Sequence, residues 1–182
     1  MSRLLVVAAA CLALVAAGCG HEEKTVGETE GIYLDVGGLK YQVQMSRYLN
    51  PNDVEDREYF AGLPESTAEA QPDETWFGVW MRVENDSDEP REAADTWEIH
   101  DTQENIYRPI PIDTDINPFV WAGGTVPGGT VWPLPDSAAG QGPTQGQLLL
   151  FKVKNDSLQN RPLELRFSTG PQGELGTYDL DV

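Results

Sequence analysis

The sequence predicts an all-β fold, an antiparallel β-sandwich, and three observations support this prediction. Short stretches alternate apolar and polar residues with the period of two that is typical of half-buried strands. The 13 prolines and 18 glycines indicate many turns, which suit short strands better than helices. No stretch shows the 3.6-residue period of a helix longer than two or three turns.

Residues 1–18 have the features of a cleaved signal peptide and are set aside from the fold. Arg3 supplies a positive charge, and the run from 4 to 15 consists of twelve apolar residues. A membrane-spanning helix needs roughly 20 apolar residues, so this run is too short to span a bilayer. Its length is that of the apolar region of a signal peptide.

The signal ends in Ala16-Ala17-Gly18, directly before Cys19. These residues resemble the lipobox of bacterial lipoproteins, although the motif usually has leucine where this chain has Ala16. The resemblance implies that Cys19 carries diacylglycerol and palmitate and anchors the chain to the extracytoplasmic face of the cell membrane. The alternative is an ordinary secretory signal that leaves Cys19 as a free thiol.

Residues 19–38 are expected to form the lipidated cysteine and a flexible tether, because they are polar, charged and rich in glycine. Within this tether, residues 32–34 could dock as an edge strand. Residues 39–182 have the length of one domain. Cys11 leaves with the signal and Cys19 is acylated, so no cysteine remains for a disulfide or a thiolate metal site.

The formal net charge is −18, from 12 Lys and Arg against 30 Asp and Glu. This excess excludes nucleic acid as a partner, because no basic patch can displace counterions from phosphates. Direct adhesion of the domain to anionic headgroups is excluded for the same reason. The membrane is therefore a partner through the lipid alone.

Strands are expected at 39–48, 76–84, 94–100, 106–108, 147–153, 163–167 and 178–182, with a short helix at 53–60 capped by Asp53. The core is expected to centre on six residues: Val79, Met81, Leu149, Phe151, Leu165 and Phe167. On the opposite face of the second strand, Trp76 and Trp80 form either a second buried layer or an exposed aromatic strip.

The Pro/Gly-rich segment, residues 109–146, holds seven of the 13 prolines and is expected to be mostly irregular or edge structure. It carries Phe119, Trp121 and Trp132, which we select as the candidate surface for a ligand or partner. Aromatic side chains on stiff loops can stack on sugar rings or anchor a protein. The alternative is that they fold back to cover an open end of the sandwich.

Several strand ends and turns resemble a domain family of Gram-positive lipoproteins. The matching positions are Val83-x-Asn85, Ser87-Asp88-x-Pro90, Trp97-x-Ile99-x-Asp101, Tyr107-x-Pro109, Leu150-Phe151-x-Val153 and Leu163-x-Leu165. The resemblance covers residues 39–182 and implies an immunoglobulin-like β-sandwich, similar in fold to secreted mycobacterial immunogenic proteins. It implies no activity, and the insert at 50–75 and the Pro/Gly-rich segment depart from the pattern.

No residue pattern indicates catalysis or a cofactor. His100 stands at a strand end, and no serine lies in a strained elbow sequence, so an envelope hydrolase is the weaker alternative. Met45 and Met81 lie on apolar strand faces and are expected in the core. Three acidic loops offer calcium-type ligands without the twelve-residue spacing of a calcium loop: Asp53, Glu55 and Asp56; Asp86, Asp88 and Glu89; Asp113 and Asp115.

The sequence therefore predicts a non-enzymatic, lipid-anchored binding or interaction module of the cell envelope. The expected partner is an envelope protein or a glycan. A carbohydrate- or calcium-binding sandwich remains the alternative within binding modules.

Overall fold

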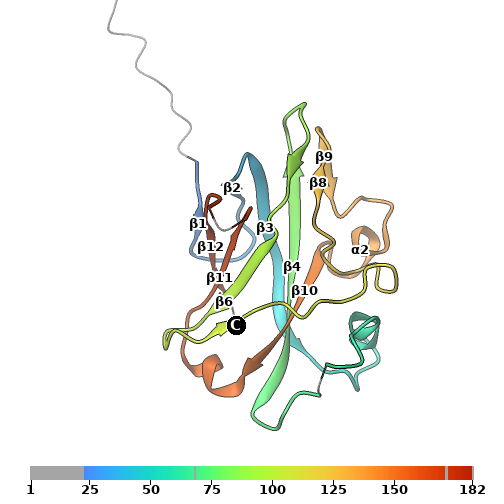
Figure 1. The fold of residues 1–182 in the computed structure, drawn as a ribbon, viewed down its shortest axis with the longest axis vertical. Helices are drawn as coiled ribbons and strands as arrows, with labels where there is room; N and C mark the ends of the chain where they lie inside the picture. Colours follow the sequence, from blue (N-terminus) through green and yellow to red (C-terminus); the bar gives the residue numbers. More distant parts are fainter. Residues whose placement is uncertain (1–22, 68, 171, 182) are drawn as a thin grey trace, which may run out of the picture.

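The computed structural model describes residues 23–67, 69–170 and 172–181. Its strands form two facing sheets (Figure 1). The first sheet contains, in spatial order, β1 (Val26–Gly27), β12 (Gly176–Leu180), β11 (Leu163–Ser168), β6 (Thr96–His100) and β7 (Ile106–Tyr107). The second contains β10 (Gln147–Lys154), β4 (Glu74–Asn85), β3 (Leu39–Leu49) and β2 (Leu34–Val36), and β9 (Thr130–Trp132) also pairs with β4.

Among the described residues, the strand pairs are antiparallel except for β1, which runs parallel to its neighbour β12. A separate small ribbon joins β5 (Arg91–Glu92) to β8 (Thr125–Val126). Helical structure in the described residues is limited to η1 (Arg57–Phe60), α2 (Ala138–Gln141) and η2 (Asn155–Gln159). The predicted all-β sandwich class is confirmed.

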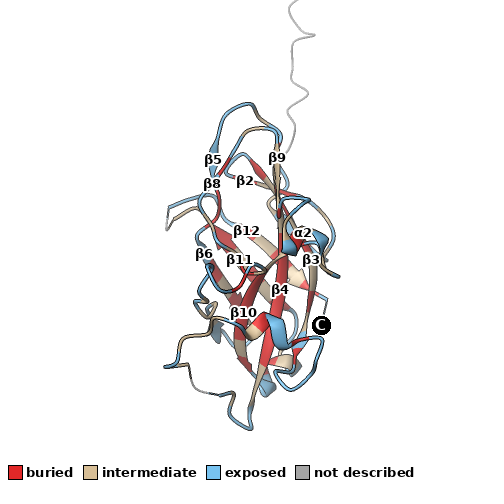
Figure 2. Ribbon diagram, turned by 90° about the vertical axis from the view of Figure 1, so that its right-hand side faces the viewer, coloured by how far each residue is buried: buried red, intermediate tan, exposed pale blue. Residues whose placement is uncertain are grey.

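The main core lies between the two sheets and follows from the alternation of the strands. Along β4, Phe77, Val79, Met81 and Val83 turn toward the facing sheet and are fully buried. Figure 2 shows β4 largely in the colour of buried residues. All six residues predicted for the centre of the core belong to this cluster, and each is at most 4% exposed. That prediction is confirmed.

A second apolar cluster covers the outer face of the sheet that contains β4. Trp76 and Trp80 lie there with Leu148 and Leu150 of β10 and with Tyr59 of the insert. This explains why β10 has a nearly continuous apolar sequence: a strand buried on both faces needs no polar positions. The two tryptophans are therefore a buried second layer and not an exposed strip.

The insert that covers this cluster contains less helix than the sequence suggested. The predicted helix over 53–60 is a single 3-10 turn, with Asp56 at its N-cap position in place of Asp53. Asp53 instead accepts a hydrogen bond from the backbone N–H of Glu55 in a local turn. Asp56 is buried and pairs with Arg47 at 2.5 Å, which fixes the insert to β3.

The predicted tether boundary at residue 38 is wrong for the described residues. Leu34 and Val36 are buried in the core, and β2 pairs with β3 in a hairpin that turns at Gly37 and Gly38. Both glycines have positive φ angles, 60° and 74°, which a two-residue hairpin loop requires. The polar composition of residues 19–38 obscured this Gly-Gly hairpin signal.

Candidate functional site

A cavity of about 530 Å³ opens at the side of the sandwich, between the start of β6 and the edge of β10. Its lining comes from residues 95–97, from residues 148–150, and from the Pro/Gly-rich segment and the residue before it, at 108–112, 114 and 120–122. This volume lies within the range of small-molecule sites, ~300–1,000 Å³. We therefore take the cavity as the candidate functional site.

Backbone hydrogen bonds hold the Pro/Gly-rich segment against the outer edge of β10. The N–H of Ile110 donates to the carbonyl of Leu150 at 2.7 Å, and the N–H of Trp121 donates to the carbonyl of Leu148 at 2.9 Å. Pro109 and Pro111 flank Ile110 and have no N–H to donate, so pairing cannot continue into a strand. The segment thus contacts the edge of β10 at two places, and residues next to both contacts line the cavity.

Trp121 forms one wall of the cavity and is fixed at several points. Its indole N–H donates to the carbonyl of Ala94 at 3.2 Å. Its ring meets that of Trp97 edge to face, with centroids 5.1 Å apart and planes at 73°. On its other side it approaches Trp132, at 6.4 Å. The carbonyl of Gly124 accepts from Ala93, so the chain after Trp121 is bound to the same short stretch.

Trp97 forms the deeper wall. Its ring stacks on Phe167 with centroids 5.0 Å apart, and it is 5% exposed. Its indole N–H is buried and has no hydrogen-bond partner among the described residues. The indole of Trp97 thus contributes packing to the wall of the cavity, and its N–H forms no hydrogen bond within the described residues.

Two charged residues line the cavity, and their environments differ. The guanidinium of Arg108 donates to Glu98 at 2.6 Å, and His100 Nε2 lies 2.9 Å from the same carboxylate. The hydrogen bond from His100, together with the charge of Arg108, lowers the pKa of Glu98. Asp95 accepts hydrogen bonds from the Gly170 N–H and the Thr96 hydroxyl, at 2.7 and 3.2 Å.

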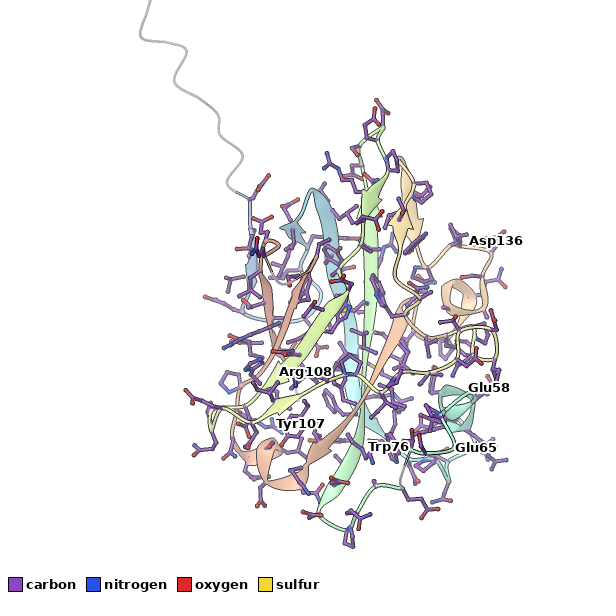
Figure 3. The ribbon with its side chains drawn as sticks, viewed as in Figure 1. Glu58, Glu65, Trp76, Tyr107, Arg108 and Asp136 are labelled. Atoms are coloured by element: carbon purple, nitrogen blue, oxygen red, sulfur yellow. The ribbon has the colours of Figure 1, made fainter. Side chains whose placement is uncertain are left out.

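No Lys, Arg or His among the described residues forms an ion pair with Asp95. The cavity is therefore bordered by one carboxylate whose charge is unmatched and by one guanidinium whose charge is matched by Glu98. Figure 3 labels Arg108, which lies beside the first sheet, far from Asp136.

The structure separates the three aromatic residues proposed from the sequence. Trp121 and Trp132 pack together against the main core, whereas Phe119 joins the second cluster and meets Tyr59 at 5.5 Å. All three side chains are half-buried, so they do not form a single exposed surface. Among the three, Trp121 alone lines the cavity. Cys19 lies outside the described residues.

Sequence reasoning missed Asp95, Trp97 and Arg108 as site residues, because they precede the Pro/Gly-rich segment. The short polar stretch before the strand at 94–100 was the only sequence feature that could have indicated a site there. Such a stretch is also typical of an ordinary turn, so it does not identify a site. Their convergence with Trp121 depends on pairing between distant strands.

The residues considered for metal binding and hydrolysis serve structural contacts. Asp86 pairs with Lys40 at 2.6 Å, and Asp113 accepts from the backbone N–H of Asp115 in a turn. In the described part of the chain, no group of three or more His, Cys, Asp or Glu side chains could hold a metal ion. His100 contacts Glu98, as noted above. Across the same residues, no helix has the length and apolar character needed to cross a membrane.

Solved structures are similar to this chain at low sequence identity. The yjhA protein of Bacillus subtilis is 11% identical, with a TM-score of 0.53 over 85% of this chain and 99% of that one. The ycdA protein, a candidate lipoprotein of the same species, is 12% identical with a TM-score of 0.47, over 87% of this chain and 39% of its own. An uncharacterized β-sandwich protein of Clostridium difficile 630 is 11% identical with a TM-score of 0.47, over 88% of this chain and 97% of that one.

No protein-family model matches the chain, and no curated protein matches it. The chain is a β-sandwich domain, and at these identities the likeness to the yjhA protein describes the fold alone.

Proposed function

We propose that this protein is a lipid-anchored, non-enzymatic binding module of the cell envelope that meets its ligand in the cavity beside Trp121. The resemblance of residues 39–182 to the lipoprotein domain family described above supports the class. The small residues before Cys19 support the anchor, since two or three acyl chains hold a protein firmly on a membrane.

The observation that carries the binding proposal is the construction of the cavity. A stiff, proline-rich segment is fixed to β10 at two points and still leaves an open volume of about 530 Å³ next to aromatic side chains and two exposed charged ones. Loops presented by a rigid scaffold are the usual position of binding residues. The charged groups at the rim of the cavity form hydrogen bonds with neighbouring groups. They do not combine into a catalytic pair of a nucleophile and a general base.

Anchoring is tested with Cys19→Ser in the full chain. We expect the wild type to fractionate with membranes and its mature N-terminus to begin at a lipid-modified Cys19 by mass spectrometry. The variant is expected in the soluble fraction or as an uncleaved precursor. An unmodified mature N-terminus at any other residue would contradict the anchor.

Binding is tested by photo-cross-linking in intact cells. A photoreactive amino acid replaces Ala122, an exposed residue that lines the cavity, and in a matched control replaces Ala138, which is exposed but lies in α2. We expect an adduct at position 122 that is absent at position 138. Equal adducts at both positions, or none at 122, would contradict a ligand site at the cavity.

A further inference from the structure

We propose that the cavity binds a small organic cation, an ammonium group carried on an apolar stem. This rests on the proposed function, because it names the chemical class of ligand for the same cavity. Three features of the described residues carry it: the charge at the rim, the indole of Trp121 and the apolar part of the lining.

The charge balance at the rim favours a cation. Asp95 places a carboxylate there with no cationic partner among the described residues, while the charge of Arg108 is matched by Glu98 at 2.6 Å. A positive group that enters thus meets a net negative site. The net charge of −18 attracts cations from a distance in the same sense and disfavours anionic ligands.

The aromatic walls favour a cation of low hydration. Trp97 and Trp121 both line the cavity, and their ring planes stand at 73° to each other. A cation over the face of an indole is attracted by the ring quadrupole. Trp97 is buried, with its ring stacked on Phe167 and in edge-to-face contact with Trp121, so the half-buried indole of Trp121 is the aromatic surface offered to a ligand. The Trp121 indole donates to the carbonyl of Ala94, so it is bound to the backbone directly before Asp95.

The floor and the boundaries of the cavity favour a small molecule over a polypeptide. Ile110, Val120 and Leu149 contribute apolar side chains to the lining, which suit an alkyl stem. The backbone of the Pro/Gly-rich segment bonds to β10 at both Leu148 and Leu150. No free run of that strand edge is left between these two contacts for an extended chain to pair with.

The test uses three probes with the same six-carbon stem: hexyltrimethylammonium, hexanol and hexanoate. Calorimetric titration of the folded protein is expected to show hexyltrimethylammonium bound at least tenfold more tightly than hexanol, with no binding of hexanoate. Similar affinity for hexyltrimethylammonium and hexanol would overturn the cation assignment, because the apolar stem alone would then account for binding.

The role of the carboxylate is tested with Asp95→Asn. The amide oxygen can still accept from the Gly170 N–H, so the fold is retained, and a thermal melt checks this. We expect at least a fivefold loss of affinity for hexyltrimethylammonium. Asp136→Asn, which removes the same charge at an exposed position far from the cavity, is expected to change nothing (Figure 3). Equal losses in both variants would overturn a local role for Asp95.

Two further outcomes separate this inference from the function on which it rests. Tighter binding of the blocked tripeptide acetyl-Ala-Lys-Ala-amide than of hexyltrimethylammonium would overturn the small-molecule assignment in favour of a polypeptide side chain. A specific adduct at position 122 without cation binding would overturn the ligand class and leave the binding function standing. Failure of both experiments would overturn both.

Discussion

Replacing Trp121 by alanine removes a half-buried indole that closes the side of the sandwich. The side chain is in edge-to-face contact with Trp97 and approaches Trp132, and its N–H donates to the carbonyl of Ala94. A fully buried aromatic residue changed to alanine costs about 3–5 kcal/mol. Because Trp121 is only partly buried, we expect Trp121→Ala to lower the free energy of unfolding by about 2–3 kcal/mol.

Trp121→Phe separates the packing of the ring from its hydrogen bond. Phenylalanine keeps an aromatic ring and loses the N–H, so the expected loss is about 1 kcal/mol. Urea unfolding followed by far-ultraviolet circular dichroism measures both variants without depending on tryptophan fluorescence. A loss below about 0.5 kcal/mol for Trp121→Ala would refute the reasoning, because the indole would then not close the sandwich.

Three further predictions concern the scaffold. Phe151→Ala, in the main core, is expected to cost about 3–5 kcal/mol in urea unfolding, and a loss under 1 kcal/mol would mean that the site collapses freely. Tyr178→Phe removes the hydroxyl that lies within hydrogen-bond distance of two carbonyls, that of Tyr41 at 2.7 Å and that of Ile32 at 2.8 Å. We therefore expect a loss of about 1–3 kcal/mol and faster amide exchange near residues 32 and 41, and unchanged exchange would count against this link. Burial raises the pKa of Asp101, but the hydrogen bonds that its carboxylate accepts, first of all from Asn105, lower the pKa by a larger amount. The pKa of Asp101 is therefore below its usual value. The ionised Asp101 carboxylate stabilises the fold above pH ~4, and this stabilisation is lost as the pH falls further. Asp101→Asn should therefore flatten the acid side of the plot of unfolding free energy against pH. Parallel plots for the variant and the wild type would contradict this.

The strands and the main core could be predicted because they depend on local alternation. The sequence of β4 assigns Val79 and Met81 to one face and Trp76 and Trp80 to the other, and the structure keeps that division. Period-two patterning determines which side chains share a face whatever the strand later pairs with. The same logic predicted β3, β10 and β11 within a residue or two.

The site could not be predicted, because it depends on which distant segments meet. Asp95 and Trp121 come together through the Ala94 carbonyl and through pairing of residues 119–121 with β10, and no local pattern encodes either contact. Phe119 was grouped with Trp121 by proximity in the sequence, yet the segment passes from one cluster to the other between them. Proximity in an irregular segment says little about a shared surface.

The central claim is that the cavity between β6 and β10 is the binding site, and the indole N–H signals of the five tryptophans test it most directly. In a nitrogen-proton correlation spectrum titrated with hexyltrimethylammonium, we predict that the signals of Trp97 and Trp121, which line the cavity, shift together. Those of Trp76 and Trp80, in the second cluster, should stay in place. Shifts at Trp76 or Trp80 with Trp121 unchanged, or no shifts at any tryptophan, would contradict the claim.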